Sequence, residues 1–191
     1  MDTDEIRTKL LDAAEQLFYE RGIQAVGVDE VRTVSGVSLK RLYQVFPAKW
    51  QLVEAYLLRR DAHWRGRLAA YVADHPDNPI PAVFDWLGEW FAEPGFRGCA
   101  FVNSFGEAGA VEPAVANVVR AHHAAVREYL RTMVADLGVT YSGELTDQLW
   151  LLLVGSSTGA AIMGDPAMAA RARSAAETLI KAATRRNPVS L

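Results

Sequence analysis

The types of side chain gathered between Ser38 and Lys49 suit hydrogen bonding to nucleic acid. Lysine and arginine can pair with the edge of guanine, and glutamine can pair with adenine. A tyrosine hydroxyl can donate to a phosphate, and the start of a helix already favours an anion beside a lysine. The side chains that we expect to contact DNA are Ser38, Lys40, Arg41, Tyr43, Gln44 and Lys49. Such a set fits a probe inserted into a DNA groove better than it fits an active site.

Catalytic and metal-binding patterns are missing from the sequence. We find no carboxylate pair at catalytic spacing, no nucleophile motif and no phosphate-binding loop, so we expect neither an enzyme nor a cofactor. The single cysteine, Cys99, excludes an intramolecular disulfide and a zinc site made of clustered cysteines. His122 and His123 are adjacent, and adjacent helical residues diverge by roughly 100°. We therefore expect no metal site.

Charge is unevenly distributed along the chain. The net charge is −3, but the segment from Ser38 to Arg67 carries seven basic residues against two acidic ones. The segment before it, up to Val37, carries four basic residues against eight acidic ones. The local field at a contact matters more for DNA binding than the net charge. The basic segment begins with the residues that suit DNA contact.

The bulk composition is that of an ordinary globular protein, with 191 residues of which 50% are hydrophobic and 23% charged. No run of about 18 apolar residues is present, so we expect no membrane span. The acidic start, with Asp2, Asp4 and Glu5, lacks the basic and apolar regions of a signal peptide. These features predict a cytoplasmic protein.

Apolar residues recur with helical period along almost the whole chain, which predicts an all-α fold of about nine helices. The segment 97–109 contains several glycines, and we expect only a short irregular helix there. The predicted helices span residues 3–21, 28–34, 38–45, 49–74, 80–92, 97–109, 112–137, 143–163 and 167–185.

The first three predicted helices are short and close together, and Gly36 stands in the turn between the second and the third. This pattern matches a helix-turn-helix, whose last helix enters the major groove of DNA. Ser38 is placed to cap that helix, and Leu39, Leu42 and Phe46 are spaced to point inward. We expect a DNA-binding domain at residues 1–48 and a second helical domain at 49–191.

Residues 14–52 resemble the TetR family of bacterial transcriptional repressors. The resemblance implies that the helix at 38–45 contacts DNA, and that Tyr43 and Lys49 contact phosphates. The matching segments are Ala14-Glu15-Gln16-Leu17-Phe18 with Gly22, Val28-Asp29-Glu30-Val31, Gly36-Val37-Ser38, Leu42-Tyr43, Phe46-Pro47-Ala48-Lys49 and Leu52.

Several positions depart from the family pattern, including Arg32 and Ser35, which replace customary alanines. Gly27 stands where the family has a serine or threonine that caps the second helix and touches phosphate, and we count it among the DNA-contacting positions. Glycine caps tolerably, so that loss costs about 0.5 kcal/mol or less. Ala48 replaces a capping serine, at a cost nearer to about 1 kcal/mol. The Lys40-Arg41 pair makes the third helix more basic than usual.

Aromatic residues are concentrated in the middle of the chain, where the resemblance implies a small-molecule pocket. The stretch from Arg97 to Ser104, followed by Glu107, also resembles a GC-x-F-x-N…E segment of one TetR subgroup. Alternatives remain: the aromatic residues could form a solid core, and Glu107 could cap the helix region near Glu112 or make an internal salt bridge. The candidate ligand-binding residues are Trp64, Trp86, Trp90, Phe101, Asn103, Phe105, Glu107, His122, Tyr129 and Trp150.

The last two predicted helices carry stripes of small and apolar residues that would let helices approach closely. The resemblance implies that the family dimerises here, through a four-helix bundle. The alternative is that both stripes face the chain's own core. The candidate interface residues are Leu149, Leu153, Ser156, Ala160, Met163, Ala172, Ala176, Leu179 and Ala183.

The sequence therefore predicts a homodimeric repressor that binds a palindromic operator in double-stranded DNA and is released by a small molecule. One alternative is a regulator of the same fold that has no physiological inducer. Another is a helical carrier or enzyme that does not bind DNA.

Overall fold

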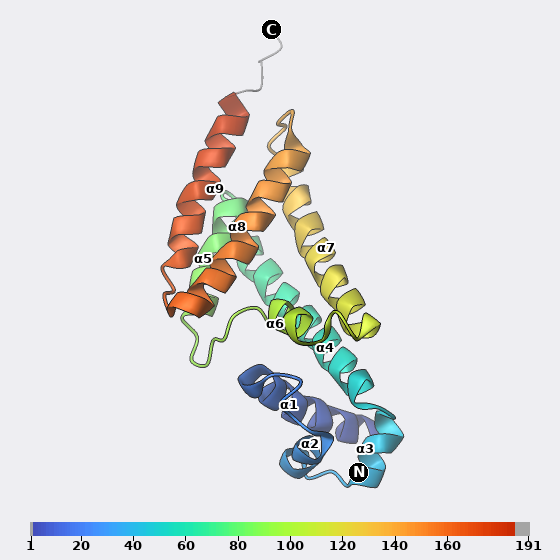
Figure 1. The fold of residues 1–191 in the computed structure, drawn as a ribbon. Coiled ribbons are helices and arrows are strands. Elements are labelled where there is room, and N and C mark those ends of the chain that lie inside the picture. Colours follow the sequence, from blue (N-terminus) through green and yellow to red (C-terminus); the bar gives the residue numbers. More distant parts are fainter. Residues whose placement is uncertain (1, 186–191) are drawn as a thin grey trace. The chain divides into compact units, whose positions relative to one another are not determined.

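The computed structural model describes residues 2–185, and within that range the chain forms nine α-helices and no strand (Figure 1). The predicted all-α fold is confirmed. The helices are α1 (Thr3–Arg21), α2 (Val28–Ser35), α3 (Leu39–Val45), α4 (Lys49–Ala73), α5 (Pro79–Phe91), α6 (Ala100–Ala108), α7 (Pro113–Ala135), α8 (Ser142–Met163) and α9 (Met168–Arg185).

Helix ends follow local chemistry. Asp2 caps α1, its carboxylate accepting a hydrogen bond from the backbone N–H of Thr3. The left-handed backbone at Gly36, with φ +67°, ends α2. Pro79 and Pro113 are the first residues of α5 and α7, where the missing N–H of proline has no helical partner to lose.

The described chain packs as two compact units. The first unit contains the chain up to His63 together with Ala100–His122, and the second contains Trp64–Cys99 together with the chain from His123 onward. Helices α4 and α7 each contribute to both units. This grouping differs from a boundary between residues 48 and 49, because part of α4, all of α6 and part of α7 pack with the first three helices. Residues 1 and 186–191 of the predicted domains lie outside the described residues.

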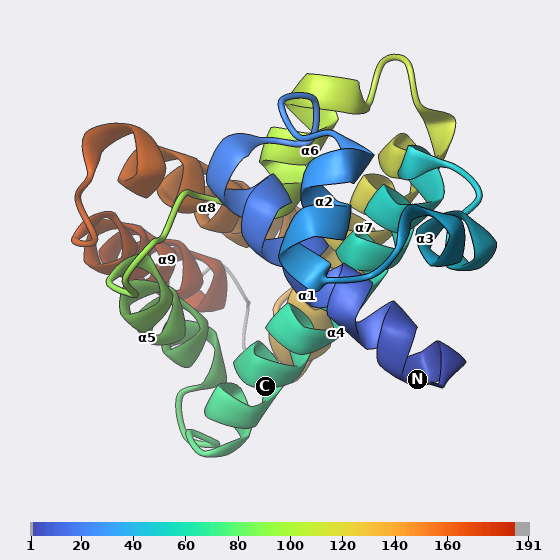
Figure 2. The same cartoon turned by 90° about the horizontal axis from the view of Figure 1, so that it is seen from below.

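The first unit is built around α1. One face of this helix buries Leu10, Ala14 and Phe18, and α2 and α3 pack against it (Figure 2). The ring of Phe18 meets the ring of Tyr56 on α4 edge to face, with centroids 5.7 Å apart. Aromatic edge contacts of this kind add to the stability gained from burial alone. The helix-turn-helix is thus attached to the first part of α4 through α1.

Acidic residues of α1 neutralise arginines of α4. Arg59 pairs with Asp12 and Glu15, each at 2.7 Å, and Arg60 pairs with Glu15 at 3.1 Å. In the second unit Arg67 pairs with Glu93. Three of the seven basic residues that we counted between Ser38 and Arg67 are therefore compensated by carboxylates elsewhere in the chain. The basic character of that segment is concentrated toward its start.

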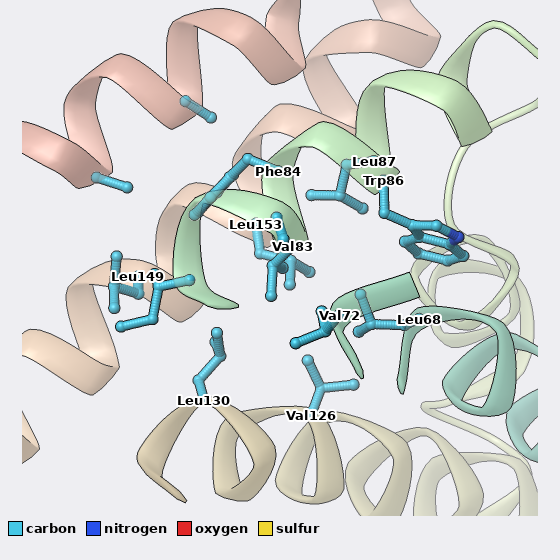
Figure 3. Packing of buried hydrophobic residues seen from close by; sticks show 14 of the residues in the cluster. Leu68, Val72, Val83, Phe84, Trp86, Leu87, Val126, Leu130, Leu149 and Leu153 are labelled. Atoms are coloured by element: carbon cyan, nitrogen blue, oxygen red, sulfur yellow. The ribbon is translucent and has the colours of Figure 1, made fainter. Parts of the chain in front are cut away.

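The second unit has an aliphatic core. Val126 and Leu130 of α7 point toward side chains of α4, α5 and α8 (Figure 3). Helices α8 and α9 pack against each other and against α5, and Gly164, with φ +62°, forms the turn between them. Within the described part of the chain, no helix combines the length and the apolar character needed to cross a bilayer.

Candidate nucleic-acid interface

Helix α3 is capped and anchored as the sequence predicts. The Ser38 hydroxyl accepts a hydrogen bond from the backbone N–H of Arg41 at 3.4 Å, and this satisfies one of the free donors of the first turn. Leu42 is completely buried, and Phe46 just after the helix is 3% exposed. The helix therefore keeps one side fixed in the core of the first unit.

The opposite side of α3 is polar and exposed. Successive helical residues are roughly 100° apart, so Lys40 and Gln44 lie almost opposite Leu42, and Arg41 and Tyr43 flank them. All four side chains are exposed, as predicted, and Tyr43 retains 43% of its surface. The face combines two cationic groups, an amide and a phenol.

Leu39 does not point inward as we expected. It is 40% exposed, because it begins a helix of only seven residues and lies roughly 60° away from Leu42 around the axis. Val34, near the end of α2, is 52% exposed. The exposed surface of α2 and α3 therefore includes apolar atoms that the sequence pattern did not reveal.

At Gly27 and Ala48 the capping hydroxyl is missing, but the backbone N–H of each residue donates a hydrogen bond to a side chain in the first turn of the helix that follows. The Gly27 N–H donates to the Glu30 carboxylate at 3.2 Å, and the Ala48 N–H donates to the Gln51 amide oxygen at 3.1 Å. In each case the acceptor belongs to the third residue of the helix, which is half of a capping box. This hydrogen bond at Gly27 lowers the pKa of Glu30, and Arg21 lowers it further.

Lys49, which we expected at a phosphate, makes an internal hydrogen bond in this structure. Its Nζ donates to the backbone carbonyl of Ile23 at 2.6 Å, in the turn between α1 and α2. Burial lowers the pKa of this amine, whereas the charges of Glu107 and Glu30 act in the opposite sense. Contact with a phosphate would require Lys49 to exchange this carbonyl for a phosphate oxygen.

Glu107, assigned to a ligand pocket from the sequence, lies against the same turn. Its carboxylate accepts the backbone N–H of Gln24 at 2.9 Å, and the Gln24 amide donates to the Glu107 carbonyl. Glu107 therefore has an internal partner, but that partner is a backbone amide and not the basic side chain that a salt bridge requires. Sequence spacing gave no signal for this contact, because Gln24 and Glu107 are 83 residues apart.

The other ligand candidates of the first unit do not share one face. Phe101 and His122 are buried and stack on each other, whereas Asn103 is exposed and Phe105 retains 44% of its surface. Arg120 lies 6.0 Å from the Phe105 ring centroid. Phe101 and His122 are thus brought together here.

In the second unit the tryptophans pack mainly on one another. Trp64 meets Trp86 and Trp90 edge to face, with centroids 5.0 and 5.6 Å apart, and all three are buried. Tyr129 and Trp150 are half-buried. The indole N–H of Trp150 is buried and has no hydrogen-bond partner within the described residues. These contacts among Trp64, Trp86 and Trp90 match the alternative of a solid core. The Trp150 indole N–H, by contrast, could still donate a hydrogen bond to a ligand.

Cavities within the second unit open at other places. One of about 370 Å³ is lined by Ile80, Leu137, Ile180 and Lys181 among others, and one of about 230 Å³ by Tyr141, Leu145 and Leu179 among others. Their linings contain none of the candidate ligand residues.

Most of the predicted interface stripe packs inside the chain. The buried members are Leu149, Leu153, Ser156, Ala160, Ala172 and Ala176, whereas Leu179 and Ala183 are half-buried and Met163 is 67% exposed. Helix α8 is apolar on most sides, so its period does not identify the face that meets the core. The large apolar side chains exposed on α8 are instead Leu151, Ile162 and Met163.

Comparisons with known proteins agree with this geometry. Residues 10–56 match the family model of bacterial regulatory proteins, tetR family. The HTH-type transcriptional activator FasR of Mycolicibacterium smegmatis is 46% identical over 56 residues, which are 29% of this chain and 26% of FasR. The match thus spans about a quarter of the length of that relative.

Solved structures extend the similarity over most of the chain. A TetR-family transcriptional regulator from Streptomyces coelicolor superposes with a TM-score of 0.85 and 28% identity, over 94% of this chain and 90% of that one. Escherichia coli NemR in its reduced form, at 20% identity, shares the fold with a TM-score of 0.80 over 91% and 97% of the two chains. A regulator from Chloroflexus aurantiacus, at 22% identity, shares it with a TM-score of 0.81 over 94% and 96%. The capped helix-turn-helix at residues 10–56 is therefore a DNA-binding domain of the tetR family of bacterial regulatory proteins, and the described chain shares the all-α fold of TetR-family regulators.

Proposed function

We propose that this protein is a homodimeric transcriptional repressor that binds a palindromic DNA operator and leaves it when a small molecule binds. The polar face of α3 carries the proposal, since Lys40, Arg41, Tyr43 and Gln44 are all exposed on a helix held by Ser38 and Leu42. Residues at the centre of such a face read base edges, and those at its sides contact phosphates. We assign Lys40 and Gln44 to bases, and Arg41 and Tyr43 to phosphates.

The homodimer is supported by the outward face of α8. Leu151, Gly155 and Ile162 are exposed and lie within about 40° of one another around the helix axis. Exposed apolar residues in such a row mark an interaction surface, and glycine allows a second helix to approach closely. A two-fold dimer presents two copies of α3 to half-sites about 34–36 Å apart, or a multiple of that distance.

Ligand response is supported by the family resemblance and by Trp150. Its buried indole N–H would gain a partner if a ligand carried a hydrogen-bond acceptor. A ligand that prefers a state unable to bind DNA shifts the population away from the operator-bound state.

Two alternatives have specific support. The mutual packing of Trp64, Trp86 and Trp90 favours a regulator with no physiological inducer. The relative FasR is a transcriptional activator, so the other alternative is that this protein activates transcription and does not repress it.

DNA binding is tested by fluorescence anisotropy with labelled DNA from the region upstream of the gene for this protein. The variant carries Lys40→Ala, Arg41→Ala and Tyr43→Phe. The control carries Lys181→Ala and Arg185→Ala on the exposed surface of α9, and Tyr141→Phe just before α8. We expect the variant to lose roughly tenfold or more in affinity and the control to bind as the wild type does. Wild-type affinity should also fall steeply with salt. Equal binding by variant and wild type, or no dependence on salt, would overturn the proposal.

A further inference from the structure

The turn between α1 and α2 is held by side chains that lie outside the helix-turn-helix. Three consecutive residues of the turn, Gly22, Ile23 and Gln24, each meet one of these side chains. Glu107 comes from α6, and Lys49 comes from the first turn of α4. A loop of the DNA-binding module thus has two attachments to later parts of the sequence.

Glu107 lies close to the backbone of the turn, and the absence of a side chain at Gly22 leaves room for its carboxylate. The Glu107 carboxylate accepts the Gln24 backbone N–H at 2.9 Å, and the Gln24 side chain returns a hydrogen bond to the Glu107 carbonyl. Gly22 has φ +89°, and a Cβ atom at that position would lie 3.0 Å from both carboxylate oxygens. A larger residue at position 22 would therefore strain the backbone and displace the carboxylate.

Lys49 forms the second attachment of the turn. Its ammonium group donates to the Ile23 carbonyl at 2.6 Å, and Glu107 is close enough to act on its charge. Arg21 and Glu30 form an ion pair across the ends of the turn, joining the last residue of α1 to the first turn of α2. The start of α2 is thus fixed relative to α6.

The other end of α6 has a firm attachment of its own. Phe101 stacks on His122 with ring centroids 3.6 Å apart, and His122 Nδ1 lies 2.7 Å from the Asp61 carboxylate on α4. His122 and Phe101 are both buried. Helix α6 therefore joins a buried contact with α4 and α7 at one end to the α1–α2 turn at the other.

We propose that Glu107 is a positioning residue for DNA binding, which fixes the α1–α2 turn to α6 so that α2 and α3 stay in their binding geometry. This inference rests on the proposed function and adds a route of regulation. Any effector that displaces α6 must move the turn with it or break the two hydrogen bonds with Gln24. Loss of the Glu107 contact lowers operator affinity even though Glu107 itself touches no DNA.

Hydrogen exchange and DNA affinity test the proposal together. In Glu107→Ala the Gln24 amide loses its acceptor, so we expect its exchange to accelerate roughly 2- to 12-fold and operator affinity to fall by a comparable factor. In Glu107→Gln an amide oxygen remains to accept the bond, so most of the affinity should return. Glu20→Ala, on the exposed surface of α1 near the same turn, is the matched control and should change neither value.

A double-mutant cycle tests the part played by Gly22. Gly22→Ala should reduce operator affinity less in the Glu107→Ala background than in the wild type, because the carboxylate that it displaces is already gone. Additive effects of the two changes would show that Gly22 and Glu107 act independently, contrary to the proposal.

The outcomes separate this inference from the proposed function. If the wild type fails to bind the upstream DNA, the proposed function fails, and with it the role of Glu107 in DNA binding. If the wild type binds but Glu107→Ala keeps full affinity at temperatures well below its melting point, the positioning role alone fails. A lower melting temperature with unchanged affinity would show that Glu107 contributes only to stability.

Discussion

The guanidinium group of Arg60 lies over the ring of Tyr19, 3.9 Å from its centroid, and also pairs with Glu15. Two elements of the first unit meet at this point, since Tyr19 and Glu15 belong to α1 and Arg60 to α4. The side chain of Arg60 is only 15% exposed. Water screens this pair less than it screens the surface ion pairs of the chain.

We therefore expect Arg60→Ala to lower the free energy of unfolding by about 1–2 kcal/mol. Arg131→Ala is the matched control, since Arg131 pairs with Glu128 on an exposed face of α7 where both side chains are more than half exposed. Urea denaturation of the two variants gives the comparison. Equal stability of both variants would show that the contact with Tyr19 contributes nothing.

The two leucines of α3 should differ sharply. Leu42 is fully buried, so Leu42→Ala should cost about 2–5 kcal/mol of stability. Leu39 is 40% exposed, so Leu39→Ala should cost less than about 1 kcal/mol. Denaturant midpoints measure both changes. A large loss of stability in Leu39→Ala would instead support the inward orientation of Leu39 that the sequence predicts.

The exposed row on α8 should govern self-association. Charges introduced by Leu151→Glu and Ile162→Glu should shift a dimer toward monomers in sedimentation velocity without lowering the stability of the monomer. Leu58→Glu is the control, because Leu58 is 53% exposed on α4. If the wild type is dimeric and the charged variant stays dimeric too, this face of α8 is not part of the dimer interface.

Stability should fall on the acid side because of His123. Burial lowers the pKa of this imidazole below its ordinary value of 6.5. The unfolded chain therefore binds a proton that the folded chain resists, and stability decreases as the pH falls below about 6.5. His123→Gln should flatten this part of the pH profile of the melting temperature.

Local chemistry explains why most helix ends could be predicted. Gly22, Gly36 and Pro47 act on their own backbone, and Ser38 reaches only three residues along the chain to cap α3. The resemblance over residues 14–52 identified the family for the same reason, since its motif lies within one short segment. These signals do not depend on where the rest of the chain packs.

Partners distant in sequence could not be predicted. Glu107 meets Gln24 through a backbone amide, and backbone amides have the same chemistry at every position. Helix α8 is apolar on most sides, so its period could not show that Leu149 faces the core and Leu151 faces solvent. Charge counting along the chain also missed the carboxylates that neutralise Arg59 and Arg60.

In α3 the residues that hold the helix in place are separate from those that we propose to contact DNA. Ser38 starts the helix and Leu42 attaches it, whereas Lys40 and Gln44 project from the opposite side. Substitutions at these two exposed positions leave the attachment untouched, so under the proposed assignment of Lys40 and Gln44 to bases a change of operator preference carries almost no folding penalty. Such a helix is readily evolvable: a duplicated gene can acquire a new target while its product keeps the same scaffold.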